Sequence, residues 1–158
     1  MSSADWQDPA VIRSVLDMPS IAIVGISANE LRPSNFVGRY LHLRGYRVIP
    51  VNPREQEIFG LPCYRSLKDV PEAVDVVVVF RLPDAVPEIA EDSVAIGARC
   101  LWLQFGVISP EAADIASSAG LSVVMDRCIK VEHARYRGRM HWFRLNTGEI
   151  SARRTPTR

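Results

Sequence analysis

The amino-acid sequence predicts a three-layer α/β fold, with about five parallel strands and helices on both faces of the sheet. Two patterns predict it. First, short segments rich in branched apolar residues alternate along the 158 residues with amphipathic segments of helical period. Second, several short segments are apolar at successive positions, as in VDVVVVF at residues 74–80, which is typical of strands buried on both faces of a parallel sheet. With right-handed crossovers, this alternation indicates a Rossmann-like sheet.

Each predicted element follows from a local signal. The strands are expected where branched apolar residues cluster between turn residues, at residues 20–26, 46–51, 74–80, 99–105 and 121–125. The helices between them are expected to begin where proline stands in a first turn, at residues 33–34, 82–84 and 109–111. They are expected to end at a glycine before the next strand, at Gly45, Gly97 and Gly120. One more helix, at residues 8–18, precedes the first strand, and another, at residues 128–137, follows the last.

The composition is that of a soluble globular domain. Hydrophobic residues make up 47% of the chain and charged residues 23%, and the formal net charge is +1. Because the chain carries almost no net charge, no overall field attracts nucleic acid or a membrane, and an anion site would have to be local. The most apolar run is too short to span a bilayer. We expect one domain at residues 1–148, followed by a basic tail at residues 149–158.

The cysteines and the first residues indicate a cytoplasmic protein. Cys63, Cys100 and Cys128 are far apart and odd in number, and they form no CxxC pair. Neither a structural zinc site nor a disulfide framework is therefore expected. Residues 1–9 carry acidic side chains and no apolar core, so we expect no secretory signal.

The turn after the first predicted strand is a candidate phosphate site. The dinucleotide-binding fingerprint has three glycines here, whereas this chain has Gly25, Ser27 and Glu30 at the three positions. The turn is also longer, and Ser34 is a candidate N-cap for the next helix. The free amides of residues 34–37 would then attract an anion. The alternative is a loop that leads into an ordinary capped helix.

The end of the second predicted strand narrows the choice of ligand. NAD-binding domains carry an acidic residue there to hold the ribose hydroxyls. This chain has Asn52, Pro53 and Arg54 instead. A guanidinium favours a phosphate on the ribose, as in NADP or coenzyme A. The alternative is that Arg54 is a solvated loop residue.

Four sequence blocks in order resemble the stand-alone CoA-binding domain family. They are GYRVIPVNP, LPCYRSLKDVPEAVDVVVVFR, GARCLWLQFGV and AGLSVVMDRCIKVEH. That family is similar to the CoA-binding domain of the succinyl-CoA synthetase alpha subunit. The resemblance covers about residues 8–139, and it implies a Rossmann-like domain that binds CoA along the carboxyl edge of its sheet.

The resemblance also implies which residues contact CoA. The phosphates would lie against the first turn, the adenosine end near the second strand, and the rest of the ligand along the third and fourth strand ends. The implied residues are Gly25, Ser27, Ala28, Asn29, Ser34, Asn52, Pro53, Arg54, Phe80, Arg81, Gln104, Phe105 and Gly106. The first turn departs from the family pattern because it is poorer in glycine. Glu30 would have to point away from a pyrophosphate there, or pair with Arg32 or Arg54.

Cys128 is the candidate for covalent chemistry. It follows Arg127 near the start of the last predicted helix, which Asp126 is expected to cap. That position would favour a thiolate and a mixed disulfide with the CoA thiol. An inert packed cysteine is the favoured alternative. Glu132 and His133 are adjacent, so on a helix they point about 100° apart and make a poor acid–base pair.

The resemblance favours a binding module over an enzyme. A CoA ligase of the synthetase type needs a phosphorylated histidine on a second domain and a nucleotide-grasp partner, and we find neither in the sequence. We therefore predict no catalytic residues and no metal ligands. The stretch RYRGRMHWFR, at residues 135–144, is interpreted as a final helix and strand at a homodimer contact rather than as a nucleic-acid site.

Three hypotheses remain from the sequence. The first is a cytoplasmic domain that binds CoA or an acyl-CoA without intrinsic catalysis. The second is an NADP-binding enzyme or a redox-sensing Rossmann domain. The third is an interaction domain that binds no small ligand.

Overall fold

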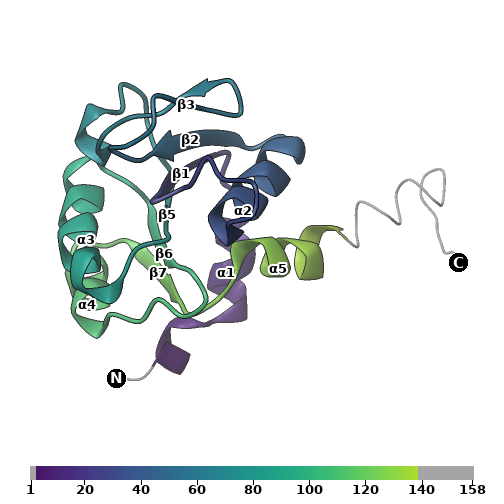
Figure 1. Ribbon diagram of the computed structural model, residues 1–158. Coiled ribbons are helices and arrows are strands. Elements are labelled where there is room, and N and C mark those ends of the chain that lie inside the picture. Colours follow the sequence, from purple (N-terminus) through teal and green to yellow (C-terminus); the bar gives the residue numbers. More distant parts are fainter. Residues whose placement is uncertain (1–2, 139–158) are drawn as a thin grey trace, which may run out of the picture.

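The computed structural model of the chain describes residues 3–138, and these form a parallel sheet between two layers of helices (Figure 1). The sheet has five strands in the order β2-β1-β5-β6-β7. Their bounds are β1 Ser20–Val24, β2 Arg47–Val51, β5 Val76–Val79, β6 Cys100–Leu103 and β7 Ser122–Met125. Every neighbouring pair is parallel. The predicted three-layer, Rossmann-like fold is confirmed.

The helices divide between the two faces of the sheet (Figure 1). One face packs against α1 (Pro9–Val15), α2 (Pro33–Leu43) and α5 (Ile129–His133), and the other against α3 (Val86–Ala95) and α4 (Pro110–Ser118). Proline lies in the first turn of α1, α2, α3 and α4. The glycines that were predicted to end α2, α3 and α4 all have positive φ angles and directly follow the C-cap residues. The stop signals and the starts of α2 and α4 were therefore correct, whereas the start expected at residues 82–84 opens a short 3₁₀ turn, Pro83–Ala85, and α3 begins at Val86.

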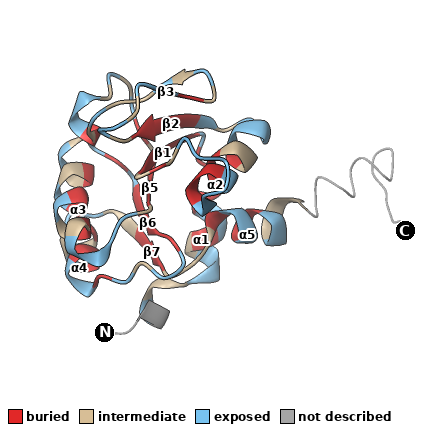
Figure 2. Ribbon diagram, in the orientation of Figure 1, coloured by how far each residue is buried: buried red, intermediate tan, exposed pale blue. Residues whose placement is uncertain are grey.

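Both faces of each central strand are buried, as the continuous apolar runs predicted (Figure 2). In β1, Ala22 and Val24 belong to the core cluster under α3 and α4, whereas Ile21 and Ile23 belong to the cluster under α1 and α2. Side chains alternate between the faces of a strand, so a strand between two helical layers needs apolar residues at every position. Trp102 of β6 fills the second cluster, and its indole Nε1–H donates to the carbonyl of Arg127 at 2.8 Å.

The chain order creates a switch point between β1 and β5. From β1 the chain passes through α2 to β2 on one side, and it returns to β5 on the other side. The loops after these strands meet at the same carboxyl edge. Ligands of open α/β sheets bind in the crevice at this kind of position.

The segment between β2 and β5 contains elements that the sequence pattern did not predict. A short hairpin joins β3 (Glu57–Ile58) to β4 (Leu61–Pro62), with positive φ angles at Phe59 and Gly60 in its turn. The chain then forms a bridge between Tyr64 and the last residue of β2. Two-residue strands fall below the length at which an alternating pattern becomes visible.

The remaining elements are short helical turns. These are η1 (Ser3–Trp6), η2 (Leu67–Asp69), η3 (Pro83–Ala85) and η4 (Ala134–Gly138), of which η4 is a π-helical turn that continues α5. The first helix is shorter than the predicted 8–18, and Asp8 is its N-cap. The stretch at residues 135–144, where a final helix and strand were expected, lies outside the described residues from residue 139 onward. The tail at residues 149–158 lies entirely outside them. Among the described residues, no helix has the length and apolar character that crossing a bilayer requires.

Candidate functional site

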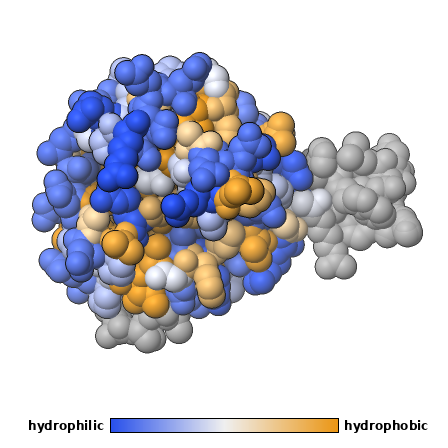
Figure 3. Space-filling model, in the orientation of Figure 1, coloured by the Kyte–Doolittle hydropathy of each residue, from blue (hydrophilic) through white to orange (hydrophobic). Residues whose placement is uncertain are grey.

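Two adjoining depressions lie at the carboxyl edge of the sheet. The first, of about 700 Å³, is lined by Arg32, Arg54 and Arg81, and we call it the arginine pocket. The second, of about 630 Å³, is lined on one side by Cys128 and Glu132, and we call it the Cys128 pocket. Figure 3 shows strongly hydrophilic and apolar surface side by side on the face of the molecule that Figure 1 presents.

Phe80 joins the two pockets because its side chain lines both. It directly follows β5, and its backbone N–H donates to the carbonyl of Val24 in β1 at 2.9 Å. Large apolar side chains are exposed on either side of it. Leu82 (79% exposed) lines the arginine pocket, and Phe105 (74% exposed) lines the Cys128 pocket. An extended ligand with one charged and one apolar part fits such a pair of pockets.

Gly25 brings the β1 and β5 ends together at the switch point. Its φ angle is +89°, and its N–H donates to the carbonyl of Val51 at 2.9 Å. A Cβ atom at this position would collide with the backbone carbonyl of Phe80 and lie 2.8 Å from Cδ of Arg81. Only glycine therefore allows this turn and this close approach of two loops.

The rest of the first turn is held by its own polar side chains. The backbone N–H of Ser27 donates to Oγ of Ser34 at 2.9 Å, and the backbone N–H of Asn29 donates to Oγ of Ser27 at 3.0 Å. Nδ2 of Asn35 donates to the Ser27 carbonyl at 2.9 Å. These groups shape the loop by bonding one another.

The predicted N-cap of α2 was wrong. The cap residue is Arg32, whose side chain makes no capping bond, and Pro33 begins the helix. Ser34 lies inside the first turn, and its hydroxyl accepts from Ser27 instead. The N–H groups of Asn35 and Phe36 donate to the Arg32 carbonyl at 3.0 and 3.2 Å. Two of the amides that were expected to be free for an anion are therefore already bonded.

Asn52 positions the arginine that follows β2. Its Nδ2 donates to the carbonyl of Ile26 at 2.7 Å, which ties the end of β2 to the β1 turn. Its Oδ1 accepts the backbone N–H of Arg54 at 2.8 Å, and this Asx turn brings Arg54 to the arginine pocket. The carbonyl of Asn52 accepts the Cys63 thiol at 3.6 Å, and burial raises the pKa of that thiol. The thiol therefore stays protonated and acts as a donor.

The arginine pocket holds three guanidinium groups that have no acidic partner among the described residues. Arg32, Arg54 and Arg81 take part in none of the ion pairs found between residues 3 and 138. A fourth arginine, Arg65, lies close by and donates to the carbonyl of Pro53 at 3.4 Å. Unpaired guanidinium groups gathered in one depression favour a ligand that carries several negative charges.

Gln104 and Asp126 hold the wall of the Cys128 pocket. Gln104 is 3% exposed, and its Oε1 accepts the N–H of Ile129 at the start of α5 at 2.9 Å. It thus pairs locally and lines the pocket as well. Oδ1 of Asp126 accepts the N–H of Gly106 at 2.8 Å, and the N-cap of α5 is Cys128. The expectation that Asp126 caps this helix was wrong, because its carboxylate bonds the β6 loop.

The far wall is one face of α5 and the turn that follows it. Cys128, Val131, Glu132 and Arg135 line the pocket at helical spacing. Glu132 is 2% exposed, and its Oε2 lies 3.5 Å from Nη1 of Arg135. His133 points elsewhere, since its Nδ1 is hydrogen-bonded to the Tyr40 hydroxyl at 2.8 Å.

The structure gathers most, but not all, of the predicted site residues. The arginine pocket contains Gly25, Asn52, Pro53, Arg54, Phe80 and Arg81, and the Cys128 pocket contains Phe80, Gln104 and Phe105. Four others, Ser27, Asn29, Ser34 and Gly106, lie in the adjoining loops and line neither pocket. Ala28 and Glu30 line a separate depression beside the β3–β4 hairpin, so Glu30 does not line the arginine pocket.

Sequence reasoning missed several residues of the two pockets. Arg32 was considered only as a partner for Glu30, and Arg127, Glu132 and Arg135 were not assigned to the ligand site. The i, i+3, i+4, i+7 spacing from Cys128 was a visible signal in the sequence for Glu132 and Arg135. Nothing in the sequence pattern alone places α5 opposite α2, which is what closes the pocket.

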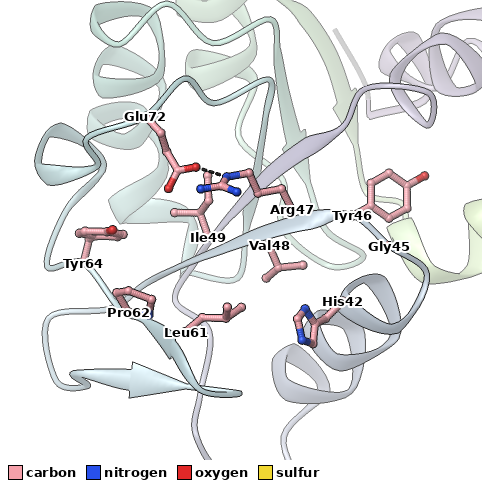
Figure 4. A pocket seen from close by; sticks show the side chains of 10 residues that line it. All are labelled: His42, Gly45, Tyr46, Arg47, Val48, Ile49, Leu61, Pro62, Tyr64 and Glu72. Atoms are coloured by element: carbon pink, nitrogen blue, oxygen red, sulfur yellow. Dashed lines mark hydrogen bonds and ion pairs between the residues drawn. The ribbon is translucent and has the colours of Figure 1, made fainter.

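A third depression, of about 440 Å³, lies on the outer edge of β2 (Figure 4). His42, Leu61 and Pro62 stand along it, and Arg47 forms an ion pair with Glu72 (Figure 4). The arginine of this depression is thus already paired. This depression is therefore a weaker candidate for an anion site than the arginine pocket.

The chain is similar to proteins of two kinds. The protein YneT of Bacillus subtilis (strain 168) is 37% identical over 126 residues, which cover 79% of this chain and 93% of that protein. The solved structure of a hypothetical protein from Pyrococcus horikoshii OT3 has a TM-score of 0.80 at 38% identity, covering 83% of this chain and 93% of that one. An ADP-forming acetate–CoA ligase I of Archaeoglobus fulgidus is 25% identical over 119 residues, which cover 69% of this chain but only 17% of the ligase.

These likenesses agree with the resemblance that the four sequence blocks carry. The model of the family described as "CoA binding domain" matches residues 19–134, from the residue before β1 to the turn after α5. The matched region contains both pockets, apart from the side chain of Arg135. The chain belongs to the CoA-binding domain family.

Proposed function

We propose that this protein binds coenzyme A or an acyl-CoA across the carboxyl edge of its sheet and has no intrinsic catalytic activity. The observation that carries the proposal is the arginine pocket. Three unpaired guanidinium groups meet there at the switch point, and the pocket continues past Phe80 into a second, partly apolar one. Membership of the CoA-binding domain family supports this ligand.

The two pockets suit the two parts of the CoA molecule. The pyrophosphate and the ribose phosphate would lie among Arg32, Arg54 and Arg81, since a phosphate monoester alone carries about −1.5 to −2 charges at pH 7. The pantetheine arm would pass Phe80 and extend along Phe105 into the Cys128 pocket. Each half of the ligand then meets side chains of matching polarity.

A binding role without catalysis is supported by how the polar side chains are used. Glu132 pairs with Arg135, His133 bonds Tyr40, and Gln104 holds the start of α5. Each of these groups has a structural task, and no nucleophile–base pair emerges from the described contacts. The three cysteines are free thiols, which fits the reducing cytoplasm that we propose as the compartment.

Thermal unfolding with and without ligand tests the proposal. A ligand at one hundred times its dissociation constant stabilises the folded state by about 2.7 kcal/mol. For a chain of this size, we expect CoA at that excess to raise the melting temperature by roughly 5–10 °C. NADP at the same concentration should have little effect. A shift with NADP but none with CoA would establish the NADP-binding alternative instead, and no shift with either would favour an interaction domain.

A further inference from the structure

We infer that the Cys128 pocket selects acyl-CoA molecules whose acyl group ends in a free carboxylate, with the Arg127 guanidinium as its counter-ion. This inference rests on the proposed CoA-binding function. It concerns the acyl group, which the contacts of the arginine pocket leave open.

The position of the acyl group follows from the junction at Phe80. If the phosphates lie in the arginine pocket, the pantetheine arm has to pass Phe80, because this side chain is common to both pockets. The thiol end and any group attached to it then enter the Cys128 pocket. Its volume of about 630 Å³ lies within the usual range of roughly 300–1,000 Å³ for small-molecule sites.

The charges of the Cys128 pocket do not cancel. The acidic and basic residues that line it are Arg127, Glu132 and Arg135. The Glu132 carboxylate lies 3.5 Å from the Arg135 guanidinium, so these two charges compensate each other. Arg127 is left over, and the pocket therefore carries one uncompensated positive charge.

Arg127 has no carboxylate partner in the described part of the chain. Its Nη1 donates at 3.3 Å to the backbone carbonyl of Asp126, which is a neutral acceptor. The Asp126 carboxylate is directed to the N–H of Gly106 instead. Arg127 is half-buried beside apolar walls that include Phe105 and Val131. A guanidinium in such surroundings loses part of its hydration, and an anion that pairs with it restores the lost interaction.

A carboxylate is the anion that fits this place. A guanidinium binds a carboxylate through two parallel hydrogen bonds, and the apolar walls suit the methylene groups that would link the carboxylate to the thioester. The ligand class is therefore the CoA thioester of a short dicarboxylic acid, with one carboxyl group in the thioester and the other free. Acetyl-CoA or unacylated CoA would leave the Arg127 guanidinium without an ionic partner.

Calorimetric titration of the full chain with matched ligands tests the inference. Succinyl-CoA and butyryl-CoA have four-carbon acyl groups, of which only the first ends in a carboxylate. We expect succinyl-CoA to bind at least about tenfold more tightly than butyryl-CoA, because a single charge-assisted hydrogen-bonded pair contributes that much to affinity. Arg127→Gln should abolish this preference, whereas Arg127→Lys should retain part of it.

Lys130→Gln is the matched control. It removes one positive charge from α5, three residues further along the chain, at an exposed residue that does not line the pocket, and should leave the preference intact. Equal affinity of the wild-type chain for succinyl-CoA and butyryl-CoA would overturn the inference and leave CoA binding standing. A large loss of affinity for free CoA in Arg127→Gln would mean that this guanidinium binds the phosphates of CoA. That result would also overturn the inference. If no CoA compound binds the wild-type chain, the proposed function itself fails.

Discussion

Arg54 stands at the end of β2, where NAD-binding domains carry a carboxylate. The Asx turn at Asn52 fixes its backbone, and its side chain lines the arginine pocket without an acidic partner in the described chain. Under the proposed function, a guanidinium at this position would favour a ribose phosphate over a ribose hydroxyl pair.

We predict that Arg54→Ala weakens CoA binding more than dephospho-CoA binding. The two ligands differ only in the ribose phosphate, and a hydrogen bond to a charged group contributes about 1.5–3 kcal/mol, or roughly 10–100-fold in affinity. Calorimetric titration of both ligands measures the difference. Arg44→Ala serves as the control, because it removes a positive charge at the C-terminal end of α2, at a residue that does not line the arginine pocket. An equal loss for both ligands in Arg54→Ala would rule out the ribose-phosphate role.

At the scale of single residues, strand ends were predictable and loop contacts were not. Gly25, Asn52 and Phe80 each follow a strand that periodicity identifies, so their meeting at one edge follows from parallel topology. The bond from Ser27 to Ser34 spans a loop of irregular conformation. A cap rule reads Ser34 as an N-cap because it considers only the sequence next to the helix, not the donor that the loop brings to it.

At the scale of elements, Tyr46 links the start of β2 to the helical layer. Its hydroxyl donates to the carbonyl of Leu16 after α1, and its ring contacts the ring of His133 edge to face. Burial, together with the nearby Asp17 carboxylate, raises the pKa of Tyr46 to about 12. This phenol therefore keeps its proton in the folded chain at pH values where an unfolded tyrosine loses it.

This pKa shift predicts how stability depends on alkaline pH. Between pH 10 and about 12 the unfolded chain binds fewer protons at this position than the folded chain, so the free energy of unfolding falls as the pH rises through that range. We expect Tyr46→Phe to be about 1 kcal/mol less stable at pH 7 and to show a smaller alkaline loss than the wild-type chain. Urea unfolding at several pH values measures both. Parallel stability curves for the two proteins would contradict the assignment, although solvent screening at this partly exposed phenol limits the size of the difference.

Element boundaries were predictable where proline or glycine marks them. The starts of α2 and α4 and the ends of α2, α3 and α4 agree with these signals. The strands are shorter than their apolar runs, because the runs continue into residues such as Phe80 and Gln104, which directly follow β5 and β6 and line the pockets. The β3–β4 hairpin and the junction of α5 with its π turn depend on tertiary contacts, which local periodicity does not express.

At the scale of the whole molecule, charge is locally concentrated although the net charge is only +1. Glu72 and Glu132, for example, pair with Arg47 and Arg135, which do not line the arginine pocket. The three-layer architecture was predictable because every layer leaves a periodic trace in the sequence. The continuity of the two pockets was not, because it requires α5 to lie against α2.

The local concentration of charge predicts the salt dependence of binding. Interactions between exposed charges are screened beyond about 10 Å at 0.1 M salt. We expect CoA affinity to fall severalfold between roughly 0.05 and 0.5 M NaCl, with a smaller fall for dephospho-CoA, which carries fewer charges. Titration at several salt concentrations measures both slopes. Affinities that do not change with salt would mean that guanidinium groups contribute little.

The outer edge of β2 has a consequence for association between molecules. Pro50 has no N–H to donate, while its carbonyl and the N–H of Asn52 are already bonded to Tyr64. Along an edge strand, the backbone N–H and C=O groups of alternate residues point to the same side. Among the remaining residues of β2, only Val48 therefore directs its N–H and C=O outward, into the depression of Figure 4. A strand from a neighbouring molecule would therefore gain a single pair of hydrogen bonds at this margin. This edge therefore offers little template for the strand pairing by which apolar segments such as β5 can build fibrils.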